Sequence, residues 1–96
     1  MEVGDLCEFV GTTFDSHAYL YKELGDGYSE VFKRVDGYNH TLRTGDQFLI
    51  LENKYNVQGK YSCIPHIARI LLNRDMISGW IIVKNEPHTK AIVKVA

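Results

Sequence analysis

A short turn phrase occurs twice in this chain, and residues that favour β-strands follow each copy. Gly4-Asp5 introduces residues 6–10, and Gly45-Asp46 introduces residues 48–51. Glycine permits the positive φ of a tight turn, and aspartate can accept hydrogen bonds from nearby backbone amides. The phrase therefore predicts where two strands begin. A phosphate loop would need a longer glycine-rich run and a lysine opening a helix, and neither copy has these.

A hairpin is predicted further along the chain. Residues 18–24 alternate tyrosine with smaller or aliphatic side chains, the period of two expected when one face of a strand meets a core. Residues 25–27, Gly-Asp-Gly, tolerate positive φ, so the chain can reverse directly into residues 28–35. If the aliphatic residues point inward, Tyr19 and Tyr21 lie together on the outward face.

One segment near the carboxyl end allows two interpretations. Pro65 and Gly79 suit the start and the end of a helix, so a short helix around residues 65–76 is the first. The second is a pair of strands over residues 67–72 and 80–83, joined by a turn. Because isoleucine is an indifferent helix former, we favour the strands.

With a closing strand over residues 90–96, the count reaches six or seven short strands, and turn signals recur about every ten residues. Residues 52–61 and 85–89 are expected to be polar connections. The pattern predicts an all-β fold, a small antiparallel barrel that occupies residues 1–96 as a single domain. Closure would remove exposed edges and let one small core serve every strand.

The order of these motifs resembles small SH3-like β-barrel proteins of bacteria and bacteriophages. The likeness lies in VGDLCEFVG, TGDQFLILENK and ARILLNRDMISGWIIVKN, where Gly-Asp introduces strands and a tight turn leads to a Gly-Trp strand. It extends over roughly half of the chain and implies binding rather than catalysis. Residues 12–43, with their extra hairpin, depart from a minimal barrel of this type.

The composition favours a cytoplasmic protein that does not enter a membrane. Acidic residues interrupt the start of the chain, and no apolar run approaches the roughly 20 residues of a membrane-spanning helix. Cys7 and Cys63 stand far apart and outside any paired motif, which predicts buried thiols rather than a disulfide.

The net charge of −1 conceals an uneven distribution. Residues 1–30 contain seven acidic residues and one lysine, hence −6, whereas residues 31–96 contain ten basic and five acidic residues, hence +5. These charges can offset one another within the fold, or they can form an acidic face and a basic face for partners.

Signals for catalysis, cofactors or metals are weak. Cys63-x-x-His66 has the spacing of half a zinc site, but the second half is missing. Cysteine, serine and histidine occur without a nucleophile context such as a glycine-flanked elbow. We therefore expect no enzyme activity, no cofactor and no metal site.

Tyrosine is the most informative residue type, since six tyrosines in 96 residues exceed what a small core needs. Exposed tyrosines commonly anchor protein partners. The leading hypothesis is a non-enzymatic protein-binding module that occludes or modulates one partner protein, as a phage-encoded inhibitor of a host factor would. The residues expected to bind this partner are the anchors Tyr19, Tyr21 and Tyr28 and the acidic rim residues Glu23 and Asp26.

Single-stranded nucleic acid is the alternative partner, because aromatic and basic side chains on a small barrel also suit it. Arg69 and Arg74 are the residues expected to contribute. The basic residues are scattered and the isoelectric point is only about 6.4, so the protein partner is favoured.

Overall fold

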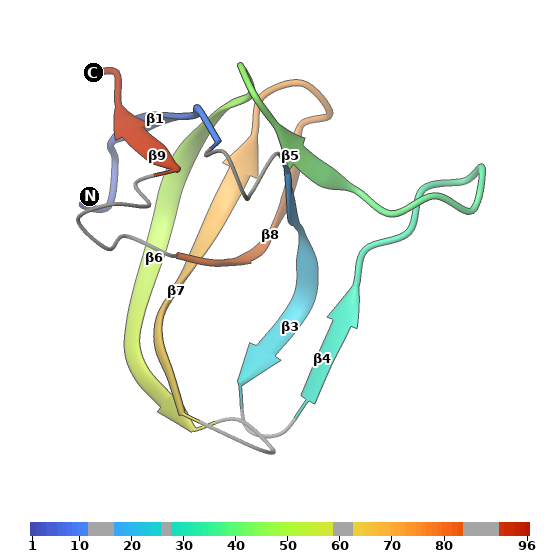
Figure 1. The fold of residues 1–96 in the computed structure, drawn as a ribbon, viewed down its shortest axis with the longest axis horizontal. Coiled ribbons are helices and arrows are strands. Elements are labelled where there is room, and N and C mark those ends of the chain that lie inside the picture. The colour runs from blue at the N-terminus through green and yellow to red at the C-terminus, as the bar shows by residue number, and fades with distance from the viewer. Residues whose placement is uncertain (12–16, 26–27, 59–62, 84–90) are drawn as a thin grey trace.

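The computed structural model describes residues 1–11, 17–25, 28–58, 63–83 and 91–96, except for the side chains of residues 25, 28 and 29. This described part is all β and contains no helix (Figure 1). Its strands are β1 (Leu6–Phe9), β2 (His17–Tyr19), β3 (Tyr21–Gly25), β4 (Tyr28–Val31), β5 (Thr41–Arg43), β6 (Gln47–Gln58), β7 (Cys63–Leu72), β8 (Ile77–Ile82) and β9 (Ile92–Lys94).

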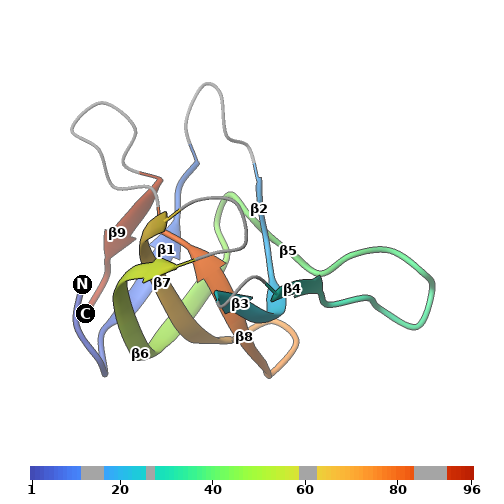
Figure 2. The same ribbon diagram turned by 90° about the horizontal axis from the view of Figure 1, so that it is seen from below.

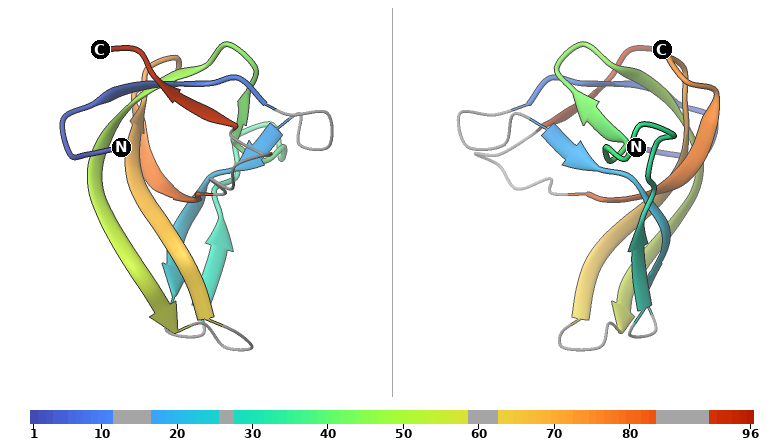
Figure 3. Two further views of the ribbon diagram at one scale, coloured as in Figure 1. Left: turned by 60° about the vertical axis from the view of Figure 1, so that its left-hand side comes forward. Right: turned by 90° about the vertical axis from the view of Figure 1, so that its right-hand side faces the viewer.

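The described strands form two antiparallel sheets. Seven strands pair in the order β4-β3-β8-β7-β6-β1-β9, and β2 and β5 form a separate two-stranded ribbon. The large sheet is strongly curved, and the ribbon lies on its open side (Figures 2 and 3). No pairing in the described residues joins the edge strands β4 and β9, so the ladder forms a curved sheet rather than a closed ring.

One core fills the space between the curved sheet and the ribbon. Along β1, and along β8 from Ser78, buried residues alternate with more exposed ones, because neighbouring side chains of a strand point to opposite faces. Leu20 and Leu42 come from the ribbon side and are fully buried. The buried core residues are Cys7, Phe9, Leu20, Leu42, Phe48, Ile50, Ala68, Ile70, Leu72, Ile81, Val83, Ala91 and Ile92.

Gly79 allows close packing between β8 and the residue that links β2 to β3. A Cβ atom at this position would lie 2.7 Å from Cγ of Leu20, closer than carbon atoms normally approach. Glycine is therefore required for Leu20 to reach its buried site. Because Leu20 is held there, the backbone on either side of it, at Tyr19 and Tyr21, is also fixed in position.

The two Gly-Asp turns are confirmed and share one hydrogen-bond pattern. Gly4 has a φ of 92° and Gly45 a φ of 96°. Oδ2 of Asp5 and Oδ2 of Asp46 each accept a hydrogen bond of 2.8 Å from the amide three residues earlier. The strands that the turns introduce, β1 and β6, pair with each other, so the turns brace opposite ends of one antiparallel pair.

The predicted hairpin is confirmed as β3 and β4, although its first arm divides at Leu20 into β2 and β3. The short helix around residues 65–76 is wrong: β7 and a turn occupy this stretch. Residues 52–58 form part of β6 rather than a polar connection. The β6 side chains of this stretch are half-buried or exposed, and the buried apolar residues of the pairing, Ile67 and Ala68, come from β7. Residues 85–89 lie outside the described residues.

The strand count and the state of the cysteines also differ from expectation. The described residues form nine strands instead of six or seven, and β6 and β7 are long, at 12 and 10 residues. Both cysteines are free; Cys7 is buried as expected, but Cys63 is exposed because it lies at the end of the β6–β7 hairpin. In this part of the chain, no helix is long and apolar enough to cross a membrane.

Candidate functional site

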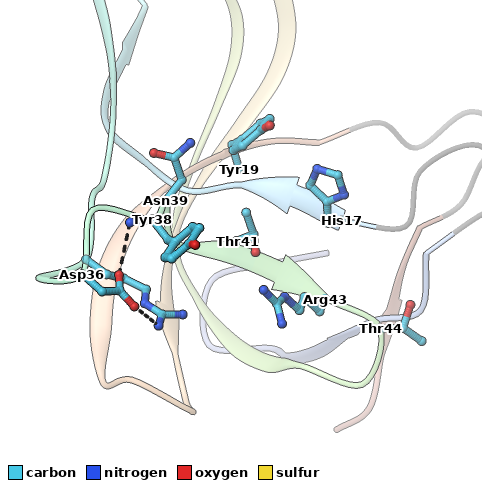
Figure 4. Close-up of a pocket in the computed structure, with 9 residues that line it drawn as sticks. His17, Tyr19, Asp36, Tyr38, Asn39, Thr41, Arg43 and Thr44 are labelled. Atoms are coloured by element: carbon cyan, nitrogen blue, oxygen red, sulfur yellow. Dashed lines mark hydrogen bonds and ion pairs between the residues drawn. The ribbon is translucent and has the colours of Figure 1, made fainter.

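A hairpin formed by residues 33–39, which we call the 33–39 hairpin, projects beside the ribbon (Figure 2). A polar cleft lies where this hairpin meets the outer face of the ribbon (Figure 4). The cleft, called the ribbon cleft below, has a volume of about 820 Å³ and opens broadly to solvent. It is lined by His17, Tyr19, Arg34, Asp36, Tyr38, Asn39, Thr41, Arg43 and Thr44.

The ribbon supplies one wall of this cleft. His17 pairs with Arg43 across the two strands, and Tyr19 pairs with Thr41. Leu42, which lies between Thr41 and Arg43 on β5, is fully buried, so the side chains of these two neighbours point outward. The rings of His17 and Tyr19 pack edge to face with their centroids 5.4 Å apart, and Tyr19 is 42% exposed. The ribbon therefore presents four polar side chains side by side.

The 33–39 hairpin supplies the other wall, and Asp36 organises it. The Asp36 carboxylate accepts a 3.1 Å hydrogen bond from the amide of Tyr38 and forms an ion pair with Arg34. The hydrogen bond from the Tyr38 amide lowers the pKa of Asp36 below its usual value, and the Arg34 guanidinium lowers it further by a smaller amount. Asp36 therefore stays ionised at neutral pH and neutralises Arg34. The turn leaves the Tyr38 side chain 71% exposed.

Arg74 fixes the ribbon wall to the body of the fold. Its guanidinium donates to the carboxylate of Asp46, with a closest distance of 3.0 Å, to Asp75, and to the carbonyl oxygen of Thr41 at 3.1 Å. Thr41 belongs to β5, and Asp46 caps the turn that follows β5. The turn between β7 and β8 thus holds both ends of this short strand in place.

Arg43 differs from the other three arginines of the chain. Its amide donates to Oδ2 of Asp46 at 2.8 Å, which fixes its backbone. Its guanidinium has no hydrogen bond or ion pair with any described residue. The other arginines each have a carboxylate partner: Arg34 with Asp36, Arg69 with Glu52 at 3.5 Å, and Arg74 with Asp46. The ribbon cleft therefore contains a cation whose hydrogen-bond donors are all free within the described structure.

The structure places Tyr19 in the ribbon cleft and Tyr21 next to it on the curved sheet. Tyr21 is half-buried and lies opposite Trp80 on β8. Burial, and to a lesser extent the nearby phenol of Tyr19, raise the pKa of Tyr21. Of these two tyrosines, only Tyr19 lines the cleft.

The remaining predicted protein-binding residues are not brought to the cleft within the described structure. Glu23 is exposed on β3, opposite Glu30 of β4. The backbone of Tyr28 pairs with that of Gly25, but its side chain lies outside the described structure. Asp26 also lies outside the described residues.

The two arginines named for nucleic acid binding both have ion-pair partners. Arg69 lies in the middle of β7, opposite Trp80, on the face of the sheet turned away from the core. Trp80 is half-buried on the same outer face, with Nζ of Lys54 5.2 Å from its ring centre. Arg74 lies in the next turn and holds β5, as described above.

Sequence reasoning did not single out Tyr38 or Arg43. A signal for Tyr38 exists in Asp36-Gly37, because a tight turn commonly displays the side chain that follows it. Arg43 could have been found through its neighbour Leu42. If Leu42 is buried in a strand, the side chain of Arg43 points outward. Both signals require the fold of residues 33–46, which the sequence left open.

The half zinc motif does not assemble into a site. Cys63 and His66 lie three positions apart on β7, so their side chains point to opposite faces. The His66 ring stacks on Tyr55 at 4.4 Å, and its Nε2 hydrogen-bonds with Oδ1 of Asn53 at 2.8 Å. Burial lowers the pKa of His66. Over the described ranges, no three histidine, cysteine, aspartate or glutamate residues are grouped to hold a metal ion.

Comparison with known proteins yields no match to a family model, a curated protein or a solved structure. The function is therefore inferred from the residues of the ribbon cleft alone.

Proposed function

We propose that this protein is a non-enzymatic binding module that occludes or modulates one partner protein through the ribbon cleft. One observation carries the proposal: the exposed rings of Tyr19 and Tyr38 line the same cleft as the free guanidinium of Arg43. Tyrosine and arginine are among the residues most enriched at the energetic centres of protein interfaces. Strand pairing and hydrogen bonds already hold their backbone in place, so binding orders their side chains but not the backbone.

Occlusion is the mechanism that suits this geometry. An open cleft of about 820 Å³ accommodates a loop or a short chain segment of a partner. The 33–39 hairpin projects beside it and would cover part of the partner surface around the bound segment (Figure 1). The curved sheet supports an SH3-like arrangement as the finer architecture, and a binding role agrees with that resemblance.

Affinity capture with matched tyrosine variants tests the proposal. Immobilised wild-type protein, the Tyr19→Ala/Tyr38→Ala variant and the Tyr55→Ala variant are incubated with lysate of the cells that make the protein. Tyr55 is a suitable control because it is 61% exposed but does not line the cleft. We expect one protein to be retained by the wild type and by the Tyr55 variant, and lost with the double variant. Equal retention by all three proteins would overturn the proposal, provided that circular dichroism shows each variant folded.

Single-stranded nucleic acid remains a second candidate, because alternating tyrosine and arginine side chains also form stacking platforms for bases. This candidate predicts oligonucleotide binding that weakens steeply with salt and with Arg43→Gln. It also predicts weaker binding when Arg69 and Arg74 are replaced. Titrations that stay flat at low salt would exclude it. The carboxylate partners of three arginines favour the protein instead, because they leave Arg43 as the one arginine without an ion pair in the described structure.

A further inference from the structure

We infer that the ribbon cleft recognises a carboxylate of the partner protein, held by the Arg43 guanidinium, while apolar neighbours of that carboxylate pack on the rings of Tyr19 and Tyr38. This inference depends on the proposed protein-binding function and adds the chemistry of the segment that is bound.

The charge balance of the cleft is the first argument. Among the described residues that line it, Asp36 is the only acidic one, and its carboxylate is already occupied by Arg34 and by the amide of Tyr38. Arg43 thus remains as an uncompensated positive charge. An incoming carboxylate would meet attraction without displacing an existing ion pair.

The geometry around Arg43 is the second argument. A guanidinium offers parallel N–H groups that match the two oxygens of a carboxylate. The backbone of Arg43 is fixed by Asp46, and Arg74 in turn holds Asp46. The hydroxyls of Thr41 and Thr44 line the same cleft and can donate further hydrogen bonds to an acceptor.

The small number of free cations favours a peptide over a nucleic acid strand. A strand carries a phosphate at every nucleotide and usually requires several cations along a groove. Among the described residues of the ribbon cleft, Arg34 is neutralised by Asp36, and Arg43 is the one cation that is left available. One carboxylate between apolar side chains matches one guanidinium between two tyrosine rings. An aspartate or glutamate side chain, or the carboxyl end of a chain, would supply this chemistry.

Nuclear magnetic resonance titration of the full-length, ¹⁵N-labelled protein tests the inference. The probes are acetyl-Leu-Glu-Leu-amide, acetyl-Leu-Gln-Leu with a free carboxyl end, the neutral acetyl-Leu-Gln-Leu-amide, and an oligothymidine of about eight nucleotides. We expect saturable shifts of the Tyr38, Arg43 and Thr44 amides with at least one carboxylate peptide. The neutral peptide should bind about tenfold more weakly, since it lacks the charged hydrogen bond. The two carboxylate probes distinguish a side chain from a chain end as its source.

Variants complete the experiment. Arg43→Gln should abolish the peptide shifts, and Arg43→Lys should keep a part of them because charge remains without the planar fork. Arg69→Gln changes the net charge equally but lies outside the cleft, so its shifts should match the wild type. Shifts with oligothymidine alone, no preference for a carboxylate, or equal losses in the Arg43 and Arg69 variants would overturn the inference. If capture of the partner still depends on the cleft tyrosines in that case, the proposed function stands and only the carboxylate is wrong.

Discussion

The ribbon cleft and the far end of the β6–β7 hairpin both display a tyrosine at the surface, with exposed fractions of 71% for Tyr38 and 61% for Tyr55. At the hairpin end, Tyr55 stacks on His66, His66 hydrogen-bonds with Asn53, and Nδ2 of Asn53 donates to the carbonyl of Met1. Each of these three side chains has a partner within the chain. In the ribbon cleft, by contrast, exposed rings lie beside a guanidinium without one.

This difference distinguishes a surface whose polar side chains are already paired within the chain from a surface that can accept a ligand. Exposure of an aromatic ring alone does not distinguish the two regions. The presence of free hydrogen-bond donors on a fixed backbone does, because such donors gain a partner on binding without a large loss of conformational entropy. Arg43 is therefore the residue on which the contrast depends.

The largest expected effect comes from breaking the packing that positions the cleft. Gly79→Ala places a methyl group against Leu20, and overpacking of this kind lowers the free energy of unfolding by about 1–3 kcal/mol. Urea denaturation measures the loss. Ser78→Ala is the control, because Ser78 is exposed on the same strand and should change stability by less than about 0.5 kcal/mol. Equal midpoints for the two variants would show that the contact with Leu20 contributes nothing.

A smaller effect distinguishes the two arginines of the β5 region. Arg74→Met removes hydrogen bonds to Asp46, Asp75 and Thr41, which after discounting for solvent exposure should cost about 1 kcal/mol of unfolding free energy. Arg43→Met removes no hydrogen bond or ion pair with a described residue and should leave stability within about 0.5 kcal/mol of the wild type. Denaturation curves of the two variants, measured side by side, provide the test. A larger loss in the Arg43 variant would mean that its guanidinium is part of the structure and not free for a ligand.

The smallest effect concerns the hairpin end and its pH dependence. Burial lowers the pKa of His66 in the folded chain below 6.5, so the unfolded chain binds this proton more tightly. The His66 contribution to stability is therefore complete above pH 6.5 and decreases as the pH falls below it. Between pH ~7.5 and ~5.5, the wild type should therefore lose more stability than His66→Gln, which has no imidazole to protonate. Denaturation at both pH values measures the difference; parallel losses in the two proteins would contradict the account.

Local signals in the sequence predict the turns and several strands. To predict the turns at Gly4-Asp5 and Gly45-Asp46, it is enough to know that glycine tolerates positive φ and that aspartate supplies a nearby hydrogen-bond acceptor. The reversal after Gly25 is predicted from residue types that tolerate positive φ. The full length of β6 was not predicted, because its second half is mostly polar and exposed, and the buried residues of this pairing, Ile67 and Ala68, belong to β7. Backbone pairing there depends on the partner strand rather than on local side chains.

The candidate site was predictable only in part. Tyr19 was identified because alternation placed Leu20 inward, and the structure confirms that Leu20 is buried. Tyr38 and Arg43 line one cleft only because the 33–39 hairpin folds beside the ribbon. Nothing in the local sequence pattern of either segment indicates this contact. The role of Arg74 likewise depends on Asp46, which is distant in sequence.

Site-specific photo-crosslinking in the cells that make this protein is the most direct test of the central claim, that the ribbon cleft is where a partner protein binds. A photoreactive phenylalanine analogue replaces Tyr38 in one variant and Tyr55 in the other, so that the two probes have similar exposure. The account predicts a discrete crosslinked protein from position 38, lost when Arg43→Gln is added, and none from position 55. Crosslinks from position 55 alone, or none from position 38, would contradict it.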